Sequence, residues 1–421
     1  MPSGFSARAR KTILEGGCAP RWAVAFGVNP RTLGASVAAS MISTFLRPLR
    51  VVLLSLICAG WPTGPAQAAE IDDELYGTPK LLALKIELPP AQVEALRKDA
   101  KAYAKGTVRE GDKVYANVGI RLKGAAGVQL LDRKPSLTIK FDEFESGQFF
   151  HGHEKLALNN ALQDSSYLSE AIGGEIYRAA GVPAARVTFA RVELNGRDAG
   201  LYVLAQTPNR DFLSDFFKKT KGNFYEGKAS DVTETLHLDS GKSPKDQADL
   251  KSLVNAAKES DLNQRLKKLG TVLDVDRFLS FVAVEVFAWH RNGYVLARNN
   301  YRIYNDPISA RLVFMPASLD ELFGKVNAPL VPDGKGMVAR AVFESPEGRR
   351  LYRERMTKLL GTAFKVETLH ARVAELAAKI RPAAARDANE TKAFDAAVAQ
   401  LKENIAQRAK FLGEELKKPA Q

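Results

Sequence analysis

The stretch that decides the fold is VYANVGIRLKG, residues 114–124. Its apolar residues stand at every second position, namely Val114, Ala116, Val118, Ile120 and Leu122. This period of two is typical of a strand with one buried face, and the strand ends at Lys123-Gly124. Residues 137–141 repeat the alternation, so we expect a second strand that pairs with the first through the connection 124–134.

The front half continues with a helix and a hairpin. Residues 167–180 carry one apolar stripe and end at a glycine followed by a proline two residues later, which predicts a helix. Residues 187–194 and 200–205 have the composition of strands, and Asn195-Gly196 between them is a hairpin turn sequence. Strands therefore dominate this part of the chain.

The rest of the chain turns helical. A helix is predicted from Asp276, followed by short strands at 300–304 and 311–315 with a turn between them. Apolar stripes at heptad-like spacing over 366–380 and 394–405 predict helices that pack on each other or on the domain. The fold class is therefore α+β, with a strand-rich N-terminal part and a helical C-terminal part.

The first 68 residues have the features of an extension and a secretory signal. Basic residues precede the apolar run 51–61, and the small-residue sequence 66–68 follows it, so we expect export and cleavage near Ala68. Met41 is a suitable start for this signal. The apolar run is too short to span a bilayer, so no transmembrane span is expected after signal removal.

Composition excludes several functions of the mature chain. Both cysteines, Cys18 and Cys58, precede the cleavage point, which leaves no thiol for disulfides, zinc–thiolate sites or a cysteine nucleophile. Without residues 1–69 the chain holds 54 Lys/Arg and 47 Asp/Glu, a net charge of +7. The absence of interleaved basic and aromatic residues argues against nucleic acid as a partner. We expect a periplasmic or secreted protein.

The common catalytic signatures, including the P-loop and the dinucleotide fingerprint, are absent from residues 69–421, but two stretches carry suggestive cations. Arg121 and Lys123 end a strand beside glycines, which suits a phosphate or an ordinary turn. Lys140 lies on the polar face of the next strand. A kinase-like site places its phosphate-binding lysine there, held by a helix glutamate such as Glu170 or Glu175. The alternative is a solvated lysine.

Two further stretches carry oxygen ligands. Asn299 and Asn300 follow the turn 292–294, where their amide oxygens would lie beside a metal ion or cap the turn. Asp320 comes just after a strand and shortly before Phe323-Gly324. A metal-holding aspartate of a kinase-like site occupies such a position, although an aspartate there also caps helices.

Taken in this order, these stretches resemble the spore coat protein H (CotH) kinase family. The resemblance covers residues 119–324 and extends onto the C-terminal helices. It rests on residues 121–124, 140–144, 147–148, 156–160, 164–170, 177–183, 192–196, 200–202, 222–227, 299–301 and 320–324. Each piece is unspecific by itself, whereas the ordered set is specific.

The resemblance implies a secreted, two-lobed, atypical protein-kinase-like fold that binds ATP with Mg²⁺ and phosphorylates Ser/Thr of extracytoplasmic proteins. It implies that Lys140 is the ATP lysine, chosen over Lys134 from strand geometry, and that Glu170 is its ion-pair partner. Arg121 and Lys123 would contact phosphate. Metal ligands would come from Asn299, Asn300 and Asp320.

The chain departs from the family pattern at the position of the catalytic base. Asn292-Gly293-Tyr294 stands where related members carry Asp-Gly-Tyr, and an amide cannot accept the proton of the substrate hydroxyl. Ser169 and Ser318 replace a basic residue and an acid that are common elsewhere in the family. The chain is therefore either an active kinase or a pseudokinase; the alternative is a non-catalytic envelope or extracellular assembly module that binds a partner.

These observations predict four segments: the extension and signal at 1–68, a leading segment at 69–110, a CotH kinase-like domain at 111–345, and a helical part at 346–421 packed on it. The partner is expected to be an extracytoplasmic protein substrate or an envelope component.

Overall fold

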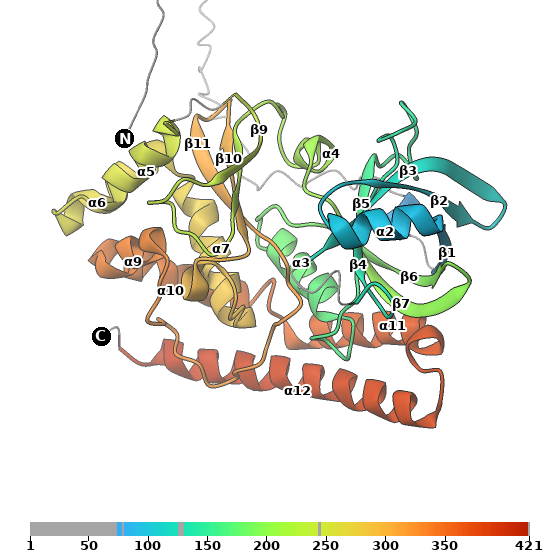
Figure 1. Ribbon diagram of the computed structural model, residues 1–421. Helices are drawn as coiled ribbons and strands as arrows, with labels where there is room; N and C mark the ends of the chain where they lie inside the picture. The colour runs from blue at the N-terminus through green and yellow to red at the C-terminus, as the bar shows by residue number, and fades with distance from the viewer. Residues whose placement is uncertain (1–73, 78–79, 125–129, 243–245, 420–421) are drawn as a thin grey trace, which may run out of the picture. The chain divides into compact units, whose positions relative to one another are not determined.

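The computed structural model describes residues 74–77, 80–124, 130–242 and 246–419. Contacts divide the chain into Met1–Pro65 and Ala66–Gln421, and every described residue belongs to the second unit. The predicted signal at 1–68 lies outside the described residues. The second unit is α+β as predicted, with strands concentrated in its first half and helices in its last third (Figure 1).

Seven strands of the first half form a closed barrel. All neighbours pair antiparallel except the first and sixth strands, which pair in parallel and close the barrel, with Leu82 opposite Ala190 and Ile86 opposite Leu194. Around the barrel the strands are β1 (Leu82–Glu87), β2 (Ala104–Glu110), β3 (Lys113–Lys123), β4 (Ser136–Lys140), β5 (Lys155–Asn159), β7 (Arg197–Gln206) and β6 (Val187–Leu194).

The stretch 114–124 forms β3 and pairs antiparallel with β4, as its alternation predicts. Val118, Ile120 and Leu122 are buried in the barrel core, where Leu137 and Leu158 of neighbouring strands pack with them. Val114 and Ala116, which the alternation also places on the buried face, are instead exposed. Asn117 has a positive φ of 55° and the β2–β3 register shifts beside it, so a bulge exchanges the two faces of the strand before Val118. The predicted hairpin is also present as β6 and β7.

A second sheet of four antiparallel strands lies outside the barrel, in the order β11 (Arg311–Pro316), β10 (Tyr301–Asp306), β8 (Phe224–Gly227) and β9 (His237–Ser240). Helix α7 (Val275–Ala288) packs on β11. The rings of Phe278 and Phe314 meet edge to face at a centroid distance of 4.8 Å. Apolar packing therefore fixes the first turn of α7 relative to the strand that leads to Asp320.

The remaining helices cover this sheet and one side of the barrel (Figure 1). Helix α3 contacts both β6 and α7, and α12 contacts α7, α10 and α11. In chain order they are α1 (Glu74–Gly77), α2 (Pro90–Lys98), α3 (Ser169–Ala179), α4 (Arg210–Ser214), α5 (Ala248–Ala257), α6 (Leu262–Val272), α8 (Tyr294–Ala297), α9 (Met337–Glu344), α10 (Pro346–Leu360), α11 (Val366–Ala384) and α12 (Ala388–Lys417). Within the described ranges, none of these helices has the length and apolar character needed to cross a bilayer.

Candidate functional site

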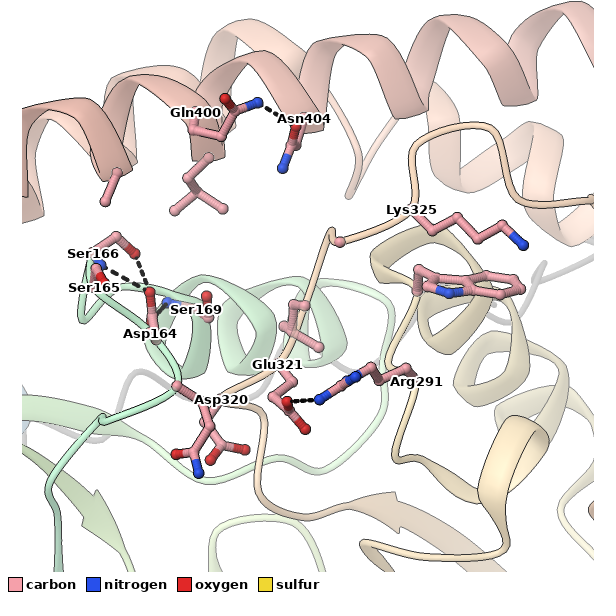
Figure 2. A pocket seen from close by; sticks show the side chains of 16 residues that line it. Asp164, Ser165, Ser166, Ser169, Arg291, Asp320, Glu321, Lys325, Gln400 and Asn404 are labelled. Atoms are coloured by element: carbon pink, nitrogen blue, oxygen red, sulfur yellow. Dashed lines mark hydrogen bonds and ion pairs between the residues drawn. The ribbon is translucent and has the colours of Figure 1, made fainter.

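Two cavities meet where α3, the end of β11 and the barrel come together. The barrel-side cavity, about 340 Å³, includes Lys123, Asn159, Glu170 and Ser318 among its lining residues. The α12-side cavity, about 480 Å³, is bounded by Trp289, Arg291, Glu321 and polar residues of α12 (Figure 2). Gln163, Asp164 and Asp320 line both cavities. The three shared residues therefore stand between two adjoining spaces.

Three polar side chains form a chain of hydrogen bonds along the barrel-side cavity. The Nζ of Lys123, at the end of β3, donates to Asn159 Oδ1 at 2.5 Å. The Nδ2 of Asn159, at the end of β5, donates to Glu170 Oε2 at 2.6 Å. Glu170 is buried in the first turn of α3, and burial raises the pKa of its carboxyl, against the opposing effects of Lys123 and Asn159. The amide thus links a lysine and a glutamate that come from different elements.

Asp164 organises the segment that enters α3. Its carboxylate accepts from the backbone N–H of Ser166 at 3.0 Å and of Ser169 at 2.8 Å, and from the Ser166 hydroxyl at 2.5 Å. These bonds satisfy donors at the start of the helix. They are visible in Figure 2, where Asp164 and the serines form one wall of the α12-side cavity. Ser169, one of the departures from the family pattern, is buried within this cap.

The predicted ion pair between Lys140 and Glu170 is wrong. Lys140 Nζ donates to Glu143 at 2.7 Å and lies 3.7 Å from Asp142. In the β3–β4 register Lys140 stands opposite Gly119, whereas Ser136, which lines the barrel-side cavity, stands opposite Lys123. Four residues along a strand separate these ends by about 13 Å, and the acids that immediately follow Lys140 therefore reach it first.

The other candidate partners and cations also have defined contacts. Glu175 forms an ion pair with Arg372 of α11 at 2.9 Å. Lys134 donates to the Tyr167 hydroxyl at 3.0 Å, and burial lowers its pKa to about 8. Arg121 lies over the ring of Tyr103, 5.1 Å from its centroid, and lines neither cavity.

The two asparagines predicted as metal ligands lie elsewhere. The Asn299 side chain accepts from the backbone N–H of Ala229 at 2.9 Å. Asn300 has a positive φ of 47°, its carbonyl accepts from Ala317 N–H at 2.9 Å, and neither asparagine lines the barrel-side or the α12-side cavity. Across the part of the chain that is described, no three His, Cys, Asp or Glu side chains gather as a metal site. Of the predicted ligands, only Asp320 lines both cavities, and burial raises the pKa of its carboxyl.

The loop that carries Asn292 is joined to the segment that carries Asp320. Asn292 Nδ2 and the guanidinium of Arg291 both donate to the carboxylate of Glu321. His290 Nε2 lies 3.1 Å from the Ser318 carbonyl, which makes this nitrogen the protonated one. These bonds cross from one loop to the other. They therefore hold Asn292 next to the segment that carries Asp320 and Glu321.

A buried glutamate of α7 accepts a hydrogen bond from the segment that follows Asn292. Glu285 of α7 is fully buried and accepts from the Val295 N–H at 2.7 Å. A Cβ at position 293 would lie 2.4 Å from Glu285 Oε1 and 2.8 Å from His290 Nδ1. Only glycine therefore fits between Asn292 and Tyr294, which explains the Gly in the turn 292–294.

Sequence reasoning missed Asn159 and Glu321 as site residues. Asn159 belongs to the stretch 156–160, in which it follows three consecutive apolar residues and its amide has no partner nearby in sequence. Glu321 is the residue after Asp320, yet its partner Asn292 lies 29 positions earlier in the sequence. Neither contact has a local sequence signal.

Comparison with known proteins identifies the family. The family described as CotH kinase protein matches residues 120–412. The "Inner spore coat protein H" of Bacillus subtilis is 22% identical over 298 residues, covering 65% of this chain and 81% of that protein. The "Invasin CotH2" of Rhizopus delemar is 24% identical over 253 residues, covering 51% of this chain and 42% of that protein.

A solved structure of HipA and HipB with operator DNA from Shewanella oneidensis MR-1 is 13% identical, with a TM-score of 0.28 over 68% of this chain and 63% of that chain. The family match, by contrast, spans well over half of the sequence and includes the end of β3, α3, the loops that carry Asn292 and Asp320, and most of α12. The chain therefore belongs to the CotH kinase protein family.

Proposed function

We propose that this chain binds a nucleoside triphosphate with Mg²⁺ in the barrel-side cavity and acts as a kinase-type protein outside the cytoplasm. The observation that carries this proposal is the convergence of Lys123, the Asn159–Glu170 pair and Asp320 on one cavity. A kinase site needs a strand lysine to neutralise phosphate oxygens, a helix glutamate to hold that lysine, and an aspartate for the metal. In this proposal Lys123, Glu170 and Asp320 take these three roles.

In this proposal Lys123 takes the role that the sequence analysis gave to Lys140. Lys123 ends a strand at the cavity and reaches Glu170 through the amide of Asn159. Lys140 is neutralised by Glu143 on its own side of the barrel. A phosphate that enters the cavity therefore meets the Lys123 ammonium, while Glu170 keeps that side chain oriented.

The donor set suits magnesium when a nucleotide is bound. Mg²⁺ binds through one or two carboxylates and takes its other ligands from phosphate and water. Of the acids that line the cavity, Asp164 bonds the start of α3 and Glu170 bonds Asn159, so Asp320 fits as the protein anchor. The bound ion would neutralise phosphate charge. Asn299 and Asn300 have no place in this set, because their side chains lie away from both cavities.

Export and an extracytoplasmic partner complete the proposal. They rest on the predicted signal at 1–68 and on the name of the spore coat relative. We place the nucleotide between the barrel as one lobe and α7 with its sheet as the other, which is the two-lobed arrangement that the sequence analysis expects. A Ser/Thr protein substrate belongs to the same proposal.

Lys123 and Lys140, on neighbouring barrel strands, should differ in their effect on nucleotide binding. With MgATP at about 100 times its Kd, the purified protein should gain about 2.7 kcal/mol of stability, a rise of a few degrees in Tm. The shift should be lost in Lys123→Ala and Asp320→Ala and retained in Lys140→Ala. Thermal-shift titrations of the four proteins measure this.

Two outcomes of that titration would contradict the proposal. A shift that disappears in Lys140→Ala but survives in Lys123→Ala would return the phosphate role to Lys140. No shift in any protein, with normal unfolding transitions, would favour the alternative function, a binding module for an envelope partner that keeps the fold without a nucleotide.

A further inference from the structure

A carboxylate from a neighbouring loop lies beside residue 292, where the family resemblance implies a catalytic aspartate. Residue 292 is an asparagine, but its Nδ2 donates directly to the carboxylate of Glu321. A carboxylate therefore lies one hydrogen bond away from the side chain that fails to provide one. The sequence comparison alone shows only the loss at 292, because the two residues are far apart along the chain.

Glu321 is placed for contact with a ligand. Its side chain is 17% exposed and lines the α12-side cavity next to Asp320. Figure 2 shows both acids at the floor of the cavity, with Gln400 and Asn404 of α12 opposite them. The amide of Gln400 donates to that of Asn404 at 2.8 Å. The cavity therefore combines an acidic floor with an uncharged polar roof.

The two cavities have complementary places in a transfer reaction. Lys123, Asn159 and Glu170 line the barrel-side cavity. Glu321 lines the α12-side cavity, and Asp320 lines both. Phosphoryl transfer needs donor and acceptor in line on opposite sides of the transferred group. An acceptor in the α12-side cavity would approach a nucleotide in the barrel-side cavity past Asp320.

We propose that Glu321 is the general base of this protein, oriented by Asn292, and that the α12-side cavity admits the alcohol side chain of a protein acceptor. This inference rests on the proposed nucleotide site. In the step, the acceptor oxygen forms a bond to the γ-phosphorus and the bond from that phosphorus to the β,γ-bridging oxygen breaks. The hydroxyl proton passes to Glu321, and the nucleoside diphosphate leaves with the bond's electron pair.

The contacts of Glu321 leave it able to accept a proton. Arg291 and Asn292 each use one of its oxygens, and every carboxylate oxygen has a second lone pair. The Arg291 side chain is 65% exposed, so its pairing is screened by solvent and weak. Asn292, in contrast, is a neutral donor whose hydrogen bond orients the carboxylate.

The test exchanges the carboxylate and the amide. Transfer from MgATP is measured as phosphoprotein formed on dephosphorylated casein or on the protein itself, and as phosphate released to water. Glu321→Gln should lower the wild-type rate by at least about 100-fold, because general-base catalysis contributes factors of this size. The control Glu347→Gln, on the exposed face of α10, should retain the wild-type rate.

The double variant separates a base from a merely structural residue. Asn292→Asp should not exceed the wild-type rate, because it sets two carboxylates against each other. Asn292→Asp with Glu321→Gln restores one carboxylate beside one amide and should recover at least a tenth of the wild-type rate. A structural role for Glu321 predicts no such recovery.

Three results would overturn the assignment while leaving nucleotide binding intact. These are wild-type protein that transfers nothing, Glu321→Gln that transfers at the wild-type rate, or transfer seen only in Asn292→Asp, which would mark a pseudokinase with one lost base. The thermal shift with MgATP is recorded for every variant. Loss of that shift in wild type would instead refute the nucleotide site.

Discussion

Replacing Arg408 with methionine is expected to lower the free energy of unfolding by roughly 1–3 kcal/mol, because buried carbonyl acceptors lose their donors. Arg408 is a fully buried cation in α12, and its guanidinium donates only to backbone carbonyls. Burial lowers its pKa to about 10, which leaves it protonated at neutral pH. Methionine has a similar length, so the variant removes the donors with little change in packing.

The acceptors of Arg408 explain why the loss should be large. Nη2 donates to Val286 at 2.7 Å and Nε to Phe287 at 3.2 Å, in the last turn of α7, where the helix dipole favours a cation. Nη1 donates to Val326 at 3.2 Å and also to Ala328. The Arg408 side chain therefore links α12 to the end of α7 and to residues 326–328. These segments adjoin the loops that carry Asn292 and Asp320.

Urea unfolding of wild type, Arg408→Met and the control Lys410→Met measures this effect. Lys410 is exposed on the same helix, so its replacement should change stability by less than about 0.5 kcal/mol. Hydrogen exchange should also become faster around Asn292 in Arg408→Met. An Arg408 variant as stable as the control would show that apolar packing alone holds α12 in place.

Elements with a strong local period could be predicted from the sequence. The β3–β4 pair, the β6–β7 hairpin, α7, α11 and α12 lie where alternation or apolar stripes place them. In these segments, apart from Val114 and Ala116 before the bulge in β3, apolar residues face the same core as the residue two or about four positions away. A few neighbouring residues therefore carry enough information to define the element.

The closure of the barrel could not be predicted in this way. Strands β1 and β6 pair in parallel although about one hundred residues separate them, and β5 has only five residues. The site was predictable only in part for the same reason. Glu170 and Lys123 were both identified as site residues, but their link depends on Asn159, which reaches them only after β3, β5 and α3 have packed together.

Replacing Glu285 with glutamine should remove a loss of stability that wild type shows as pH rises from 6.5 to 8. Burial raises the pKa of Glu285 to about 8, from 4.5 in the unfolded chain, although backbone N–H groups of residues 294–296 oppose this shift. The unfolded chain therefore loses this proton at lower pH than the folded protein. The stabilising contribution is complete below pH 4.5 and is lost as pH rises toward 8.

A second buried group sets the pH window for the experiment. Burial lowers the pKa of His290 to about 4, from 6.5 in the unfolded chain, so its contribution is complete above pH 6.5 and is lost as pH falls toward 4. The two groups oppose each other below pH 6.5. Between pH 6.5 and 8 only Glu285 of this pair changes its contribution, by about 2 kcal/mol at 1.36 kcal/mol per pH unit.

Urea unfolding of wild type and Glu285→Gln at pH 6.5 and 8 tests this expectation. Glutamine keeps an oxygen for the Val295 N–H but has no proton to lose. The free energy of unfolding of the variant, relative to that of wild type, should therefore increase by about 2 kcal/mol from pH 6.5 to pH 8. Other titrating groups cancel in that difference. Equal pH dependence in both proteins would mean that Glu285 is already ionised in the folded protein at pH 6.5, because water reaches it. Because Glu285 supports the loop that carries Asn292, agreement would show that the loop rests on a carboxyl group kept neutral by the core.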